Sequence, residues 1–179
     1  GATNLISPLA EAHCSSIPLI CIISDVARGW EHRRTRGNAS QAMDQMEMFI
    51  PVSKWQVRIT DPKSLDNIVD HAFRVATSGK PGPVVVCIPE DVAGADFEFR
   101  DPVTGRDGAT YPATRSAPDP DSVKQAVSAL GKAERPILIV GGGAHISGAG
   151  EQVRELTELL NIPVVTSISG KGIIGEDHA

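Results

Sequence analysis

Aromatic residues are scarce in this chain: phenylalanine, tyrosine and tryptophan make up 4% of its 179 residues. Long apolar runs are also missing, since the longest, at residues 17–23, is far below the roughly 20 residues that cross a bilayer. The net charge is −5 and no stripe of lysine and arginine stands out, which argues against a nucleic-acid partner. We therefore predict neither a membrane span nor a nucleic-acid interface.

Cysteine and metal-binding patterns are sparse as well. The three cysteines, Cys14, Cys21 and Cys87, lie among apolar neighbours and form no CxxC pair, so we predict buried free thiols instead of a metal site or a disulfide. The five histidines are dispersed without the spacing of metal ligands, and we predict no metal site. No basic leader is evident at the start of the sequence, so the expected compartment is the cytoplasm.

Alternating strand and helix periods predict an α/β fold made of two partial, doubly wound parallel sheets. Apolar runs bounded by serine or proline are typical of strands that are buried on both faces. The expected strands are residues 17–23, 54–59, 83–89, 136–140 and 162–165. The expected helices are residues 2–14, 41–50, 61–79, 119–131 and 151–160, with residues 24–38 as a loop. Because each sheet is partial, we expect about three parallel strands in each.

A change of composition separates two predicted domains. Residues 95–118 are rich in aspartate, proline, glycine and threonine and have no apolar period, which is typical of a linker. After it, Asp119 and Pro120 repeat the N-cap and first-turn proline that begin the helix at residue 61. The predicted domains are therefore residues 1–94 and 119–179.

Two segments have the composition of a ligand site. Gly141, Gly142 and Gly143 stand between a predicted strand and a helix, where a nucleotide phosphate could approach the backbone. A structural turn explains them equally well, because Ile146 stands where a dinucleotide fingerprint needs glycine. An arginine-rich loop follows the first predicted strand, and a solvated loop is favoured there over an anion site. Its arginines are Arg28, Arg33, Arg34 and Arg36.

Several segments, in order and at matching separations, resemble the acetolactate synthase branch of the thiamine-diphosphate-dependent enzymes. They begin with Gly-Ala-Thr-Asn-Leu at 1–5 and continue at 16–20, 51–54, 72–84, 88–92, 135–143, 162–167 and 170–178. Residues 79–92 carry the most specific part. The resemblance implies the second half of a pyrimidine-binding domain for residues 1–94 and the first half of a central domain from residue 119.

The resemblance also implies roles for individual residues. The opening turn, with Gly1 and Asn4, and Gln41 would lie near the aminopyrimidine ring of thiamine diphosphate, and Lys54 near the substrate channel. In the members that bind FAD, Arg28 and the glycines Gly141, Gly142 and Gly143 would contact the flavin nucleotide. The activating glutamate and the motif that holds Mg²⁺ and diphosphate would lie outside this sequence. We therefore expect no catalytic residue in this chain and no cofactor bound to it alone.

The expected function is thus part of a thiamine-diphosphate enzyme, a transferase or lyase that acts on 2-oxo acids. Partial sheets leave apolar edges open, so a homo-oligomer is expected. The alternative is a catalytically silent nucleotide-binding α/β module. An NAD-dependent oxidoreductase is the weakest hypothesis, because the end of the strand at 162–165 lacks an acidic partner for the ribose.

Overall fold

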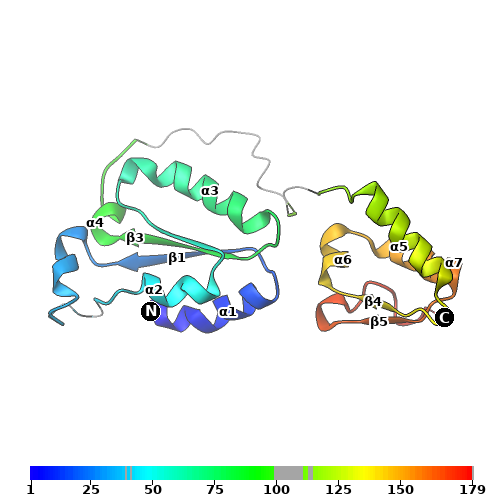
Figure 1. Ribbon diagram of the computed structural model, residues 1–179. Coiled ribbons are helices and arrows are strands. Elements are labelled where there is room, and N and C mark those ends of the chain that lie inside the picture. Colours follow the sequence, from blue (N-terminus) through cyan, green and yellow to red (C-terminus); the bar gives the residue numbers. More distant parts are fainter. Residues whose placement is uncertain (39, 41, 99–110, 113–114, 179) are drawn as a thin grey trace. The chain divides into compact units, whose positions relative to one another are not determined.

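The computed structural model describes residues 1–38, 40, 42–98, 111–112 and 115–178. The chain divides into two compact units, Gly1–Ala113 and Thr114–Ala179. We call them the first and second units and describe each by itself (Figure 1).

The first unit is built on a parallel sheet of three strands in the order β1-β3-β2. These are β1 (Leu19–Asp25), β2 (Trp55–Arg58) and β3 (Pro83–Pro89). Leu19 lies opposite Pro83, and Trp55 lies opposite Val84. The central strand is therefore the last of the three in the chain, and it matches the predicted residues 83–89.

Helices cover both faces of this sheet. The helices α1 (Ile6–Cys14) and α2 (Met46–Phe49) lie on one face and α3 (Leu65–Thr77) lies on the other. Short helical segments fill the connections: η1 (Ala2–Leu5), η2 (Arg28–Arg33), η3 (Ile50–Val52), η4 (Pro62–Ser64) and α4 (Glu90–Ala93). Asp61 begins the segment before α3 as predicted, because its carboxylate accepts a hydrogen bond of 3.0 Å from the Lys63 N–H.

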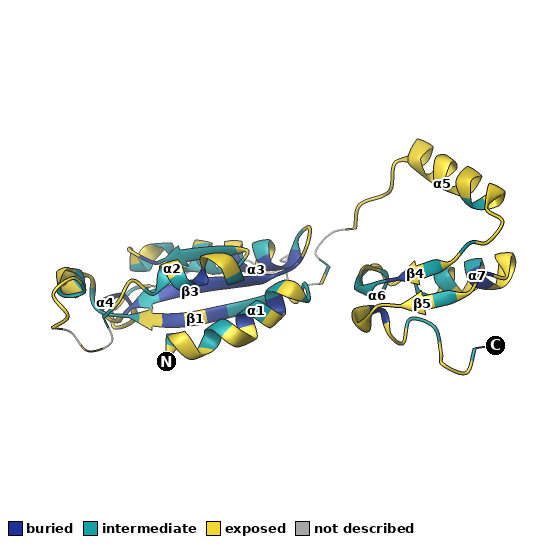
Figure 2. Ribbon diagram, turned by 60° about the horizontal axis from the view of Figure 1, so that its bottom comes forward, coloured by how far each residue is buried: buried dark blue, intermediate teal, exposed yellow. Residues whose placement is uncertain are grey.

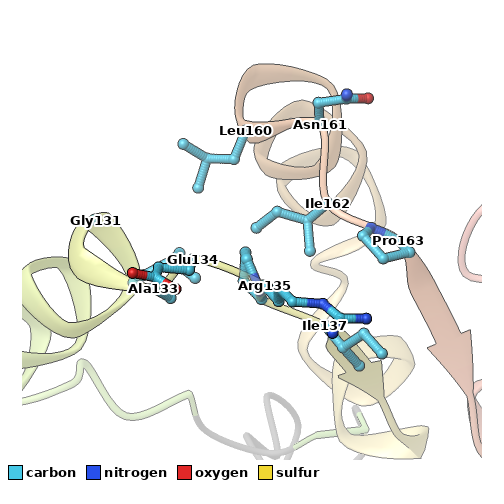
Figure 3. A pocket seen from close by; sticks show the side chains of 11 residues that line it. Gly131, Ala133, Glu134, Arg135, Ile137, Leu160, Asn161, Ile162 and Pro163 are labelled. Carbon is cyan, nitrogen blue, oxygen red and sulfur yellow. The ribbon is translucent and has the colours of Figure 1, made fainter.

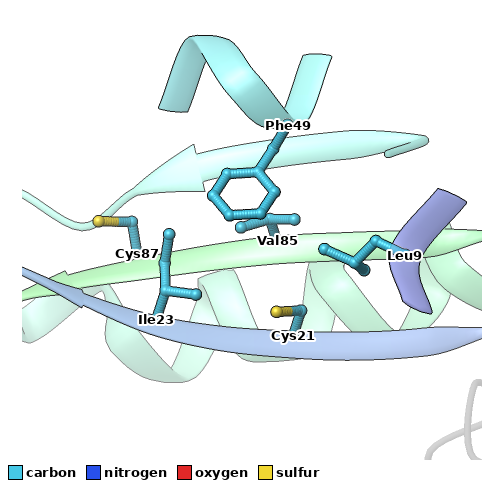
Figure 4. Close-up of a cluster of buried hydrophobic side chains, with 6 residues drawn as sticks. All are labelled: Leu9, Cys21, Ile23, Phe49, Val85 and Cys87. Atoms are coloured by element: carbon cyan, nitrogen blue, oxygen red, sulfur yellow. The ribbon is translucent and has the colours of Figure 1, made fainter. Parts of the chain in front are cut away.

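Two apolar clusters flank β3, because successive side chains of a strand point to opposite faces. Val85 and Cys87 pack with Phe49 and Leu9 on the side of α1 and α2 (Figure 4). Val84 and Val86 pack with the alanines of α3 on the other side. All four of these β3 side chains are at most 1% exposed, and β3 is the most deeply buried strand of the sheet (Figure 2).

The second unit holds a parallel pair of strands, β4 (Leu138–Val140) and β5 (Val164–Thr166), with Leu138 opposite Val164. Its helical segments are α5 (Pro120–Lys132), α6 (Gly142–Ser147), α7 (Gly150–Leu160) and η5 (Ile168–Gly170). Asp119 caps α5 as predicted, by accepting a 2.7 Å hydrogen bond from the Ser122 N–H. The described part of this sheet has one strand fewer than expected.

Several apolar side chains of the helices and the sheet are exposed in the second unit. Val123 and Val127 of α5 are 42% and 64% exposed, and Leu159 of α7 is 79% exposed. On the sheet, Ile139 is 73% exposed. The described residues leave the apolar face of α5 largely uncovered, whereas α7 has Val153 and Leu156 half-buried and Thr157 buried.

Some local predictions were wrong. The helix predicted at residues 41–50 contains only α2, and β1 runs two residues past its predicted end, because Ser24 and Asp25 pair with Ile88 and Pro89. Cys14 is exposed, whereas Cys21 and Cys87 are buried. Among the described residues, no helix is long and apolar enough to cross a membrane.

Candidate functional site

A hollow of about 770 Å³ lies at the carboxyl ends of the first unit's strands. We call it the carboxyl-edge hollow. Its lining comes from the N-terminal turn, the end of β1, the segment before α2, and α4; these residues are Gly1, Ala2, Leu5, Ile22–Val26, Ser40, Gln45, Glu90 and Ala93. Parallel α/β sheets bind ligands at this edge, because the loops that follow the strands converge there.

Two polar side chains of the hollow, Gln45 and Asp25, are hydrogen-bonded to backbone groups around them. The Gln45 side chain donates a 2.6 Å hydrogen bond from Nε2 to the Ser24 carbonyl, which ties the segment before α2 to the end of β1. Asp25 accepts from the Val26 N–H at 2.8 Å. Hydroxyl, amide and carboxylate groups therefore line the hollow, with Glu90 as its exposed acid.

Asp25 also belongs to a cluster of four charged residues next to the hollow. The other members are Glu31, Arg34 and Arg58. The Asp25 carboxylate, only 4% exposed, accepts hydrogen bonds from the Arg34 guanidinium and from Arg58 Nε, the latter at 2.9 Å. Arg58 also binds Glu31. Although burial lowers the pKa of Arg58, these hydrogen bonds and charges raise it above its ordinary value. Two acids and two guanidinium groups balance, so this cluster stabilises the carboxyl edge and is not a free basic patch.

Three of the four arginines in the arginine-rich loop make contacts within the first unit. Arg34 is bound to Asp25, and the guanidinium of Arg33 lies 4.3 Å from the ring centre of Trp30. Arg28 donates to Asp91 from its backbone N–H at 3.0 Å and from Nε at 2.7 Å. These hydrogen bonds hold the pKa of Asp91 below its ordinary value. The role of Arg28 as a flavin contact stays a prediction.

Lys54 lies at the opposite edge of the sheet, because it immediately precedes β2. Its ammonium donates to the carbonyls of Val75 and Ser78, both at 2.5 Å, where α3 ends. A cation at a helix C-terminus binds the last free carbonyls and interacts favourably with the helix dipole. Loss of surrounding water lowers the pKa of Lys54 below its ordinary value. The structure thus separates Lys54 from the carboxyl-edge hollow, and its place in a substrate channel stays a prediction.

The residues predicted to lie near the aminopyrimidine ring are only partly brought together. Gly1 lines the hollow, and its carbonyl accepts a 3.1 Å hydrogen bond from the Asn4 N–H in η1. The Asn4 residue is exposed. Gln41 lies outside the described residues, although its neighbour Ser40 lines the hollow.

The glycine turn of the second unit is shaped by packing. Gly141 precedes α6, and a Cβ added to Gly142 would lie 2.9 Å from the Ser169 Cβ. A Cβ on Gly170 would lie 2.2 Å from the Val140 carbonyl oxygen. In contrast, a Cβ on Gly143 would meet nothing within 4 Å. Of the three glycines in the turn, Gly142 is thus required for close packing, whereas the backbone at Gly143 faces open space.

A second hollow, of about 790 Å³, lies at the amino ends of β4 and β5 (Figure 3). The segments that line it are the end of α5, the approach to β4 and the turn before β5. Ile137 and Leu160, among its lining residues, are 62% and 42% exposed. Because this is the edge at which strands begin, it is not where parallel α/β sheets bind ligands.

Sequence patterns missed several residues that build the carboxyl edge. Gln45, Asp25 and Arg58 were not predicted to act together, because their contacts join segments 21 to 33 residues apart in the chain. The strand order β1-β3-β2, which only the structure gives, brings Asp25 and Arg58 together across the end of β3. Across the described part of the chain, no group of three His, Cys, Asp or Glu residues could hold a metal ion.

The α/β chain is similar in sequence to one class of known enzymes. Residues 123–179 match the family model described as thiamine pyrophosphate enzyme, central domain. The chain is 32% identical over 179 residues to a probable acetolactate synthase large subunit of Methanocaldococcus jannaschii, and this match covers 99% of the chain and 30% of that protein.

Two further relatives agree. The chain is 36% identical over 180 residues to an acetolactate synthase of Arthrospira platensis, covering 99% of the chain and 30% of the relative. It is also 36% identical over 180 residues to the acetolactate synthase large subunit of Corynebacterium glutamicum, covering 99% and 28%. The chain therefore belongs to the thiamine-diphosphate-dependent enzymes, on their acetolactate synthase-like branch. It spans less than a third of the length of these relatives.

Proposed function

We propose that this chain is part of a thiamine-diphosphate-dependent enzyme that joins or cleaves 2-oxo acids, as a transferase or lyase of the acetolactate synthase type. The observation that carries the proposal is the match of 99% of the chain, at 32% to 36% identity, to proteins with that name. The fold also supports the proposal, because the carboxyl-edge hollow lies where parallel α/β sheets bind ligands.

The hollow is the proposed place of the aminopyrimidine ring. Its volume of about 770 Å³ lies within the roughly 300–1,000 Å³ of small-molecule sites. The hydroxyl, amide and carboxylate of Ser40, Gln45 and Glu90 suit a ring that carries an amino group. Gly1, Asn4 and Gln41 are the proposed contacts.

The chain's proposed task is to hold and orient the ring. Thiamine diphosphate, when bound, supplies the carbanion chemistry that 2-oxo acids require. The hydrogen bond from Gln45 to the Ser24 carbonyl and the ion pairs of the buried Asp25 stabilise the residues that line the hollow. Residues outside this sequence are proposed to bind diphosphate and Mg²⁺ and to activate the ring, so we expect this chain to be inactive alone.

FAD is a further proposed ligand, at the turn between β4 and α6. Support comes from the open space at Gly143, which lets a ligand approach the backbone there. The same turn supports the alternative, a catalytically silent nucleotide-binding module. That alternative requires nucleotide binding without any effect of thiamine diphosphate.

Thermal-shift titrations test the proposed ligands. We expect the 179-residue chain to show no shift with thiamine diphosphate and Mg²⁺, and none with NAD. A shift with FAD alone is expected under both functions, so the activity of the complete protein distinguishes the enzyme from the silent module. A tight, Mg²⁺-dependent shift with thiamine diphosphate would contradict the proposal that the anchoring groups lie elsewhere.

The protein encoded by the complete gene tests the activity itself. We expect it to convert pyruvate to acetolactate, and we expect Asn4→Ala and Gln41→Ala each to raise the thiamine diphosphate concentration needed for half-maximal activity roughly tenfold, which corresponds to one good hydrogen bond. Asn67→Ala, at an exposed position of α3, is the matched control. Activity that does not depend on thiamine diphosphate would overturn the proposed function.

We also propose a homo-oligomer. In the described residues β1 pairs only with β3, so its outer edge has free backbone groups. Ile22 on that edge is 64% exposed, beside a hollow of about 450 Å³ that Phe73 also lines. We expect light scattering to give at least a dimer and Ile22→Lys to reduce it to a monomer. A monomeric wild-type chain at micromolar concentration would exclude this proposal.

A further inference from the structure

One arginine connects the loops that follow all three strands of the first unit. Arg28 belongs to the loop after β1, and its Nη1 donates to the carbonyl of Thr60, which follows β2. Its backbone N–H and Nε both donate to Asp91, which lies in the first turn of α4 after β3. Both oxygens of the Asp91 carboxylate are therefore used by a single residue.

This contact lies directly beside the carboxyl-edge hollow. Val26, two residues before Arg28, lines the hollow from the side of β1. Glu90 and Ala93, on either side of Asp91 in the chain, line it from the side of α4. The contact between Arg28 and Asp91 therefore joins the segments that form these two walls.

We propose that Arg28 is a positioning residue that fixes the width of the carboxyl-edge hollow by holding Asp91 and Thr60, and that it is not a free cation for a nucleotide phosphate. A carboxylate that accepts two hydrogen bonds from one arginine is held in direction as well as in distance. The side chains of Arg28 and Asp91 are 42% and 33% exposed. The contact therefore orients the loops and adds little to overall stability, as is usual for exposed ion pairs.

The proposal rests on only one part of the proposed function, namely that the hollow is a ligand site. It is independent of which ligand binds there. If thiamine diphosphate proves irrelevant, the effect of Arg28 on the two walls is still expected.

Hydrogen exchange of the 179-residue chain tests the contact. We expect Arg28→Gln and Asp91→Asn each to speed amide exchange in residues 26–34 and 88–94 about three- to tenfold, the range for a partly exposed charge-assisted contact. The double variant should be no faster than either single variant, because both remove the same contact. Exchange in α3 and in the second unit should not change. Arg33→Gln is the matched control, since it belongs to the same loop but contacts Trp30, and it should leave residues 88–94 unchanged.

FAD binding, followed by flavin fluorescence, separates a positioning residue from an anion contact. If Arg28 positions the wall, Arg28→Gln and Asp91→Asn change FAD affinity in the same direction or leave it unchanged together. If Arg28 binds phosphate, Arg28→Gln weakens FAD binding and Asp91→Asn strengthens it by releasing the guanidinium. That opposite response, or unchanged exchange at residues 88–94 in Arg28→Gln, would overturn the proposal.

Discussion

The two units use the same βαβ construction but bury very different amounts of it. In the first unit β3 lies between two strands and two helical layers, and four consecutive side chains, Val84 to Cys87, are at most 1% exposed. In the second unit β4 and β5 have only each other as described strand neighbours, and their register partners Ile139 and Val165 are 73% and 48% exposed. The comparison shows that an apolar pattern predicts a strand, whereas burial of that strand depends on neighbours on both sides.

The same contrast applies to the helices. The α3 helix buries Ala72 and Ala76 against the sheet. The α5 helix has the same length, a clear amphipathic pattern and a good N-cap, yet none of its residues is buried. Local signals therefore suffice to form a helix, and tertiary partners decide whether its apolar face contributes to stability.

Core truncation should give the largest difference between the units. Phe49 is fully buried among side chains that include Leu9, Val85 and Cys87. We therefore expect Phe49→Ala to lower the free energy of unfolding by about 3–5 kcal/mol. Val127→Ala in α5 should change it by less than about 0.5 kcal/mol, because that side chain already contacts water. Urea unfolding of the first unit is measured by tryptophan fluorescence, because Trp30 and Trp55 both lie there. Circular dichroism follows the unfolding of the helices, including α5.

Two outcomes would contradict this difference in burial between the units. A cost above 1 kcal/mol for Val127→Ala would mean that α5 buries its apolar face in solution. If Phe49→Ala does not fold, Phe49→Leu replaces it with an expected cost of about 1–2 kcal/mol, since most of the apolar volume is kept. A neutral effect of Phe49→Leu together with Phe49→Ala would contradict the burial of this position.

The next largest effect is expected in the second unit, where close backbone packing replaces a large core. Gly170→Ala would place a Cβ 2.2 Å from the Val140 carbonyl oxygen, so the turn after β5 must shift, at a cost of about 1–3 kcal/mol. Gly143→Ala is the matched control. It has open space and a helical position, where alanine is favoured over glycine by up to about 1 kcal/mol.

Hydrogen exchange in residues 138–147 and 164–173 measures this effect without interference from the first unit. Gly170→Ala should accelerate exchange in both segments, and Gly143→Ala should slow it or leave it unchanged. Equal acceleration by the two variants would mean that this packing does not stabilise the unit, and that the glycines are free to serve a ligand.

Sequence patterns predicted the fold class and the position of β3, because an uninterrupted apolar run between two prolines leaves little ambiguity. They placed the end of β1 two residues too early, since Ser24 and Asp25 look like loop residues until their pairing with Ile88 and Pro89 is known. Pairing between distant strands is a tertiary effect, and local composition does not encode it.

The candidate site was less predictable than the fold. Gly1 was correctly associated with a turn at the start of a helix, since it directly precedes η1. Partners of the arginines could not be predicted, because Arg28 and Asp91 are 63 residues apart in the chain. The loop composition favoured a solvated loop over an anion site, whereas in the folded arrangement acids neutralise Arg28 and Arg34.

The smallest effect on the free energy of unfolding is expected for the cysteines, because their titration leaves stability near pH 7 unchanged. Their reactivity still reports which of them are buried. All three cysteines belong to the first unit, and only Cys14 is exposed. Burial raises the pKa of Cys21, and burial together with the Asp25 charge raises the pKa of Cys87 from 9.0 to about 11. At pH 8 the thiolate fraction of Cys87 is then about a hundredfold below that of an ordinary thiol. We expect a thiol reagent to modify Cys14 rapidly and the other two cysteines much more slowly.

Comparing one apolar position in each unit sharpens this test. In a Cys14→Ser background, Val127→Cys places a thiol on the exposed face of α5, and it should react at the rate of a free thiol while Cys87 stays protected. Because the folded pKa of Cys87 is raised, its contribution to stability is complete below about pH 9 and is lost as the pH rises through 11. Protection of Cys87 should therefore weaken over that alkaline range. Slow modification of the thiol at position 127, or rapid modification of Cys87 at pH 8, would show that the units do not differ in burial as described.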